Sequence, residues 1–167
     1  PASKGTQVSL GAVIGVPAAK WKGQQIDQST ALASMLAATT APQKALGILG
    51  SEIYDSAANR AALRALSFEA YGQTEGYFPD TTVTAFDKRN VRDGHYAAWS
   101  HVFYLTNVDA LGKPTSAAVG RIIDTFTGAP GAAAPTGVDP LKLVASKGLV
   151  PLCAMNVQRA AEGGPLT

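Results

Sequence analysis

The chain has 167 residues, of which 46% are hydrophobic and 16% are charged. This length and apolar content are enough for a buried core, which excludes a disordered tail. The formal net charge of +2 arises from 14 basic and 12 acidic side chains, which are spread along the chain without a basic run. The charge pattern therefore argues against a nucleic-acid partner.

The first residues form the leading candidate for a binding motif, because small, hydroxyl and glycine residues precede an apolar stretch. They are Ser3, Lys4, Gly5, Thr6 and Gln7. The stretch predicts a helix over residues 7–14 with Thr6 as its N-cap. Such a turn directs backbone N–H groups and the positive end of the helix dipole to one point, which favours an anion. The alternative is that Ser3 and Thr6 are ordinary helix caps.

The next segments alternate between helical and extended patterns. Ser29 can cap a second helix that ends before Pro42. Residues 45–50 are a short apolar run between turn residues, which predicts a buried strand. Residues 66–71 alternate between apolar and polar side chains, which predicts a half-buried strand. This succession favours an α/β domain.

Residues 86–96 contain the densest cluster of ionisable and hydrogen-bonding side chains. Arg92 is a candidate partner for an anion, and His95 a candidate donor. The simpler interpretation is that the charged residues of this cluster pair with one another across a polar loop. A lone histidine beside aromatic residues is also more often packed and hydrogen-bonded than a ligand.

The last third of the sequence predicts a strand at residues 99–106 and two helices. Ser116 caps an amphipathic helix that Gly128 ends, and Asp139 caps the second. An exposed Ala-, Pro- and Gly-rich loop, residues 129–137, separates them. Residues 149–157 are predicted to form a final strand.

The sequence carries no motif of a known catalytic site. It lacks a Gly-x-Ser-x-Gly elbow, a His-Glu-x-x-His pair and a phosphate-binding Walker loop. The single cysteine, Cys153, lies in an apolar segment and is expected to be a small buried hydrophobe. We therefore predict no enzymatic activity, no catalytic residue, no metal site and no cofactor.

Several segments, taken in order, resemble the distal half of periplasmic phosphate-binding-protein-like solute receptors. The matching segments are Ser-Lys-Gly-Thr-Gln at 3–7, Ala-Leu-Gly-Ile-Leu at 45–49, Tyr-Phe-Pro-Asp at 77–80, Phe-Asp-Lys-Arg-Asn-Val-Arg-Asp-Gly-His-Tyr at 86–96 and Pro-Leu-Cys-Ala-Met at 151–155. The resemblance implies a type 2 solute-binding fold with two α/β lobes. Residues 1–96 would form a second-lobe segment that begins at the anion loop. Residues 97–167 would supply a crossover strand and return to the first lobe, whose N-terminal part is absent from the chain.

The resemblance also implies a function. A periplasmic or secreted receptor of this kind holds a small oxyanion, with phosphate the first candidate, in an inter-lobe cleft and delivers it to a membrane ABC transporter. Its ligand-binding residues here would be Ser3, Lys4, Gly5, Thr6, Gln7 and Arg92. Lys4 stands where the family has a ligand-binding serine, and no arginine precedes the loop. An N-terminal companion polypeptide from the same precursor is expected to complete the site. The alternative is an accessory or structural subunit that associates with a partner chain.

Overall fold

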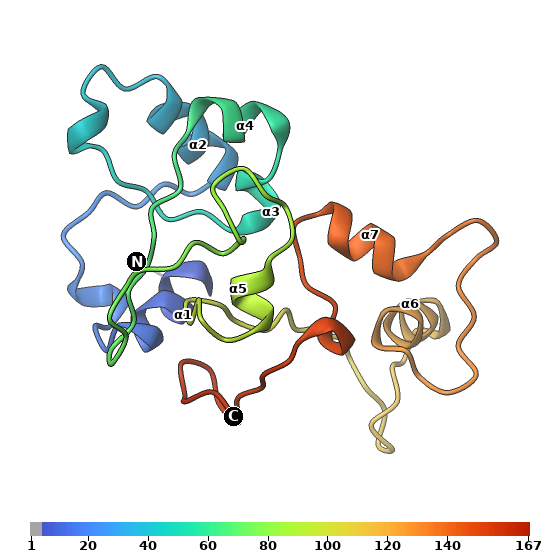
Figure 1. Cartoon of the computed structure of the whole chain (residues 1–167). Helices are drawn as coiled ribbons and strands as arrows, with labels where there is room; N and C mark the ends of the chain where they lie inside the picture. Colours follow the sequence, from blue (N-terminus) through green and yellow to red (C-terminus); the bar gives the residue numbers. More distant parts are fainter. Residues whose placement is uncertain (1–4) are drawn as a thin grey trace.

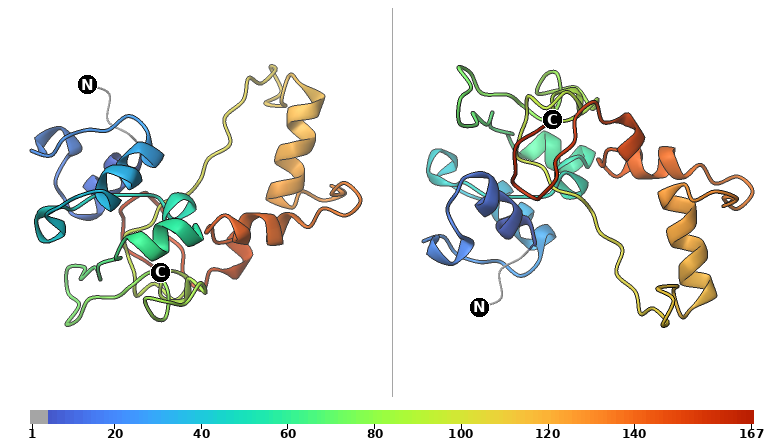
Figure 2. Two further views of the ribbon diagram at one scale, coloured as in Figure 1. Left: turned by 90° about the horizontal axis from the view of Figure 1, so that it is seen from above. Right: turned by 90° about the horizontal axis from the view of Figure 1, so that it is seen from below.

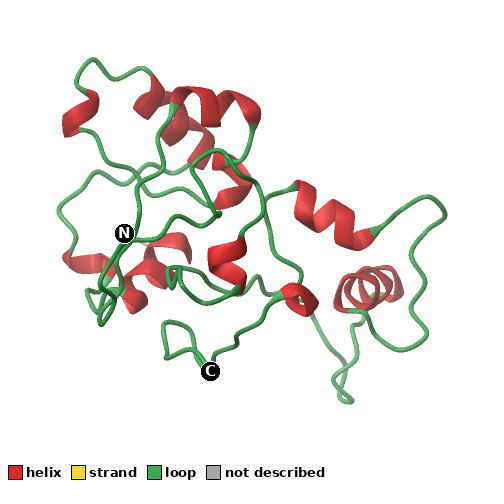
Figure 3. Cartoon of the chain, in the orientation of Figure 1, coloured by secondary structure: helices red, strands yellow, loops and turns green. Residues whose placement is uncertain are grey.

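The protein is represented by a computed structural model, in which residues 5–167 are described and form helices joined by long loops (Figures 1 and 3). The α-helices of these residues are α1 (Gly5–Val13), α2 (Ser29–Ala37), α3 (Ser51–Tyr54), α4 (Ala57–Ala62), α5 (Arg89–Arg92), α6 (Ala117–Thr127) and α7 (Pro140–Ser146). Three 3-10 helices lie between them: η1 (Ala18–Lys20), η2 (Pro42–Lys44) and η3 (Leu152–Ala154).

The predicted α/β fold is wrong. The structure is 36% helical with only 2% strand or bridge, and it has no sheet within residues 5–167. This does not fit a type 2 periplasmic-binding fold of two α/β lobes. Residues 45–50 and 99–106 belong to neither helix nor strand. Residues 66–71 contribute one isolated bridge, between Phe68 and Tyr77, and residues 149–157 contain η3.

The reason for this difference is that strand-forming residues make a strand only when another strand lies beside them. Each of the four predicted strands has the β-branched, aromatic or apolar residues of a strand, but within residues 5–167 no neighbouring segment supplies a ladder of backbone partners. A helix, in contrast, satisfies its backbone within one segment. The helical predictions therefore depended less on distant residues.

The predicted helix ends in the last third of the chain are confirmed. The Ser116 hydroxyl accepts a hydrogen bond from the Val119 N–H at the start of α6, and Gly128 ends that helix with a φ of 70°. The Asp139 carboxylate accepts hydrogen bonds from two N–H groups in the first turn of α7, at 3.0 and 3.1 Å. Local sequence is thus sufficient to place both helices.

The chain forms a body and an arm (Figure 2). The body comprises residues 5–96 and residues 155–167, which return to it near the C-terminus. The arm comprises residues 107–147, in which α6 and α7 pack against each other. Residues 97–106 connect the body to the arm as an extended stretch of chain, which we call the extended thread. Residues 148–154 connect the arm back to the body.

Few side chains are fully buried. Among the residues that the structure describes, Ala33 and Val91 are the buried hydrophobic ones, whereas Asp80, Lys88 and Arg159 are buried although they are charged. Polar interactions therefore hold the centre of the body to an unusual extent. None of the helices in residues 5–167 is both long and apolar enough to cross a membrane.

Candidate functional site

The predicted anion-binding residues fall at the amino end of α1. Gly5, Thr6 and Gln7 form its first turn, so Thr6 lies inside the helix rather than at its N-cap as predicted. Ser3 and Lys4 lie outside the described residues. The N–H groups of a first helical turn have no acceptor within the helix, and Gly5 and Thr6 are exposed. Within the described residues, this end of α1 is therefore exposed at Gly5 and Thr6.

The same end of α1 borders a groove of about 400 Å³. One wall is α1 itself, and the other comes from the extended thread and from the C-terminal residues of the body. The lining residues are Gly5, Val8, Ser9, Ala12, Ser100, His101, Phe103 and Glu162. Segments that are far apart in sequence thus meet along one side of α1, from Gly5 at its amino end to Ala12 near its carboxyl end.

A histidine and a carboxylate pair inside this groove. His101 Nδ1 lies 2.6 Å from Glu162 Oε1, and the same oxygen accepts a hydrogen bond from the His101 backbone N–H at 3.2 Å. The second carboxylate oxygen, Glu162 Oε2, is buried and has no hydrogen-bond partner. A buried acceptor without a partner is costly, which makes this oxygen a candidate for a further contact.

A buried arginine lies behind the histidine–carboxylate pair. Arg159 is 8% exposed, and its guanidinium carbon lies 3.9 Å from the centre of the Trp99 ring. The guanidinium donates to the backbone oxygens of Trp99 and Ala97, at 3.2 and 3.0 Å, while its Nε and the indole Nε1 of Trp99 have no partner. Burial lowers the pKa of Arg159, and the nearby charge of Glu162 opposes this. No carboxylate of the described residues forms an ion pair with it.

Arg92 does not line the groove. Its Nε donates to the backbone oxygen of Ala154 at 2.9 Å, and its own backbone oxygen accepts from the Asn156 N–H at 2.9 Å. Arg92 therefore ties α5 to the chain segment that returns from the arm. The structure gathers Gly5, Thr6 and Gln7 at one place and puts Arg92 elsewhere.

The remainder of the polar cluster at residues 86–96 has the structural role that the sequence favours. Arg89 pairs with Asp93 at 3.3 Å on the surface, and the amide of Asn156 donates to Asp93, which lowers the pKa of that carboxyl. His95 stacks on the Tyr77 ring, with 5.0 Å between the ring centres. None of these residues faces the groove.

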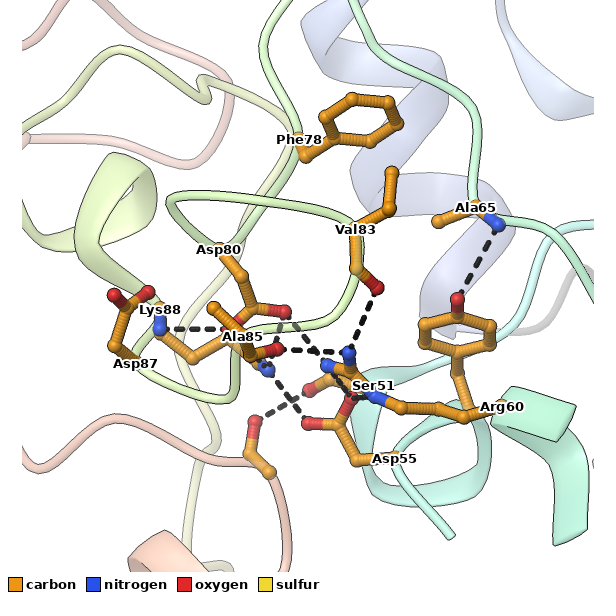
Figure 4. A network of polar contacts seen from close by, with 12 residues as sticks. Ser51, Asp55, Arg60, Ala65, Phe78, Asp80, Val83, Ala85, Asp87 and Lys88 are labelled. Atoms are coloured by element: carbon orange, nitrogen blue, oxygen red, sulfur yellow. Dashed lines mark hydrogen bonds and ion pairs between the residues drawn. The ribbon is translucent and has the colours of Figure 1, made fainter. Parts of the chain in front are cut away.

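Sequence reasoning missed a buried network of four charges (Figure 4). Arg60 Nη2 lies 2.6 Å from both Asp55 Oδ1 and Asp80 Oδ2, and Lys88 Nζ lies 2.6 Å from Asp55 Oδ2 and 2.9 Å from Asp80 Oδ1. We call these four residues the charge network. Its two cations and two carboxylates balance, so it is a structural centre rather than a site for an ion.

Aromatic rings and backbone oxygens complete the surroundings of Arg60. Its guanidinium carbon lies 3.8 Å from the centre of the Phe86 ring and 5.0 Å from that of Tyr54, and Nη1 donates to the Ala85 oxygen at 2.8 Å. Burial lowers the pKa of Arg60, but the hydrogen bonds to the carboxylates outweigh this and raise it. The Asp55 side chain is nearly buried, at 10% exposure. Its burial results from contact with Lys88, which is distant in sequence.

Two further predictions concern metal and thiol chemistry. No group of three or more metal-ligating side chains occurs among the residues that the structure describes. Cys153 is exposed, so the expectation that it is buried is wrong. It lies on η3, whose short turn leaves this side chain on the surface.

Comparison with known protein families, with curated proteins and with solved structures found no match to the chain.

Proposed function

We propose that the chain is a non-enzymatic binding protein that holds a small oxyanion, with phosphate as the first candidate, at the amino end of α1. It would act outside the cytoplasm and deliver the anion to an ABC-type transporter. The observation that carries the proposal is the start of α1, where Gly5 and Thr6 are exposed and Gly5 lines the groove. Helix amino ends favour anions because of their unpaired N–H groups and the helix dipole.

The charges around the groove also bear on the proposal. Glu162 repels an anion, but it is paired with His101, and the buried Arg159 lies behind this pair. Arg159 lacks a carboxylate partner within the described residues, so its positive charge is not cancelled by direct contact. An oxyanion in the groove would add negative charge near the desolvated guanidinium of Arg159 and so offset part of the cost of burying it.

Calorimetric titration of the full chain with inorganic phosphate tests the proposal. Gly5→Pro removes one N–H donor at a helix start, where proline is tolerated, and Gly5→Ala keeps that donor. A side chain meets no atom within 4 Å at this position. A hydrogen bond to a charged group contributes about 1.5–3 kcal/mol, so we expect phosphate to bind at least about tenfold more weakly to Gly5→Pro than to Gly5→Ala. Equal affinity, or no phosphate binding by the native chain, contradicts the proposal.

A second candidate function is an accessory or structural subunit that associates with a partner chain. The accessible surface is 11605 Å², whereas a compact monomer of this mass exposes about 7,800 Å². Large apolar side chains contribute to the excess, among them Leu46, Tyr71, Leu105 and Leu111. Native mass spectrometry separates the candidates. A stable complex with a second polypeptide and no response to phosphate favours the accessory role.

A further inference from the structure

The extended segment, which we define as residues 101–106, exposes apolar side chains on both sides. Side chains alternate along an extended backbone, so Phe103 and Leu105 share one side and Val102 and Tyr104 the other. Leu105 is 92% exposed, Phe103 67% and Val102 64%. A strand that is apolar on both sides is typical of the interior of a sheet.

The backbone of the extended segment is also unpaired. Across residues 5–167, no backbone hydrogen bond reaches an N–H or C=O group of residues 102–106. Figure 2 shows the part of the extended thread nearer the arm running with no ribbon alongside it, whereas its body end faces α1 across the groove. An exposed apolar segment with free backbone donors and acceptors is a template for the addition of another strand.

The ring contacts of the extended segment within the chain involve His101, Phe103 and Tyr104. The His101 ring approaches Trp99 and Phe103 at the groove, with centre distances of 5.3 and 6.1 Å. On the other side Tyr104 stacks on Phe126 of α6, with 6.3 Å between the ring centres. These contacts hold the segment extended and leave Val102 and Leu105 uncovered.

The chain as a whole exposes more surface than a compact monomer of its mass. The excess over a compact monomer is roughly 3,800 Å², while a standard interface covers about 800 Å² on each partner. The excess is spread over the chain, and the extended segment contributes part of it through Val102, Phe103 and Leu105.

A second copy of the chain does not suit this surface. Two extended segments paired with each other would make a two-stranded ribbon whose apolar sides both remain exposed, and such a ribbon is marginal in water. A partner that already has a sheet covers the segment better. The segment contains no charged residue other than a protonatable histidine, His101, so the partner strand beside it needs apolar side chains.

We propose that residues 101–106 dock as an additional strand on the edge of a β-sheet in a partner polypeptide whose sheet is apolar on both sides. This inference rests on the association proposed above as the second candidate function, and names its surface and the chemistry of the partner. It does not depend on oxyanion binding.

Hydrogen exchange of the native assembly tests the inference. The full chain, tagged at its C-terminus, is isolated with its partner, and native mass spectrometry gives the composition of the complex. Amide exchange is then compared with that of the chain alone. We expect the amides of residues 102–106 to exchange at least 100-fold more slowly in the complex, because they become ladder donors.

Two proline variants provide the matched comparison. Tyr104→Pro removes a donor from the middle of the extended segment, and Ala133→Pro places proline in an exposed Ala- and Pro-rich loop. We expect Tyr104→Pro to weaken the complex at least 100-fold and Ala133→Pro to leave it unchanged. Retained phosphate affinity or an unchanged circular dichroism spectrum shows that Tyr104→Pro is still folded.

Three other results would each overturn the inference, and each has a different explanation. A complex in which residues 102–106 exchange freely shows that association is real but uses another surface. Protection of these amides in a homodimer identifies a second copy as the occupant. A chain that stays monomeric in its native source contradicts both the inference and the accessory role.

Discussion

The body and the arm are held together by different kinds of interaction. In the body, the charge network joins Asp55 and Arg60 to Asp80 and Lys88 across 20 or more residues of sequence. In the arm, α6 and α7 are capped by the residue just before each helix. The body therefore depends on distant partners, and the arm on local ones. For this reason we expect a substitution in the body to lower the unfolding free energy more than one in the arm, and to affect a larger part of the chain.

The largest effect is expected from Asp80→Asn. This change leaves Arg60 and Lys88 buried with one carboxylate between them, and breaking a buried ion pair from one side costs about 3–5 kcal/mol. Urea denaturation measures the loss of unfolding free energy. Asp124→Asn, on the exposed face of α6, is the control and should change it by less than about 0.5 kcal/mol. A loss below about 1 kcal/mol for Asp80→Asn contradicts a stabilising charge network.

A double variant sharpens this test. Adding Lys88→Met to Asp80→Asn removes one charge of each sign, so the remaining Arg60 and Asp55 are again balanced. The double variant should be less destabilised than the sum of the two single variants, because coupled residues are not additive. Strict additivity would show that these charges act independently.

A smaller and more local effect is expected from Asp139→Ala in the arm. The change removes the acceptor for two N–H groups of α7, and loss of an N-cap costs about 1 kcal/mol. Amide exchange within α7 should accelerate about fivefold, while exchange within α4 stays unchanged. Equal acceleration in α4 would mean that the body and the arm unfold as one unit.

The carboxylate of Asp87, at the edge of the body, leads to a prediction about how stability depends on pH. The Thr81 hydroxyl and N–H donate to its carboxylate and lower the pKa of Asp87 to about 2. A lowered folded-state pKa stabilises the fold above the unfolded value, about 3.9, and this contribution is lost as pH falls toward 2. Thr81→Val should raise the pKa of Asp87 in an NMR titration and flatten the acid dependence of stability. Thr84→Val, in the same loop, should leave that pKa where it is.

The smallest effect is expected at Cys153. Because the thiol is exposed, iodoacetamide should alkylate it in the folded protein about as fast as in the unfolded chain. Cys153→Ser should leave the unfolding free energy unchanged within about 0.5 kcal/mol. A protected thiol would show that another polypeptide covers η3 in the sample. Ready alkylation is explained by exposure and gives no support to a catalytic thiol.

Sequence alone determined the features whose causes lie within a few residues. Ser116, Gly128 and Asp139 placed the ends of the two arm helices, because a cap and the N–H groups it accepts from belong to one turn. The sequence also placed a helix start near residues 5–7, although the helix begins at Gly5 and Thr6 is not its N-cap.

Tertiary structure alone decided whether an extended segment becomes a strand and which charges are buried. Residues 45–50 and 99–106 have strand-forming side chains but find no strand beside them in the described chain, so the predicted sheet is absent. Asp55 and Lys88 meet only because the intervening segment, which consists of α4 and a long loop, folds back. The groove likewise joins α1 to Glu162 near the other end of the chain. Such contacts depend on how distant segments pack, and the local periodicity of the sequence does not predict that packing.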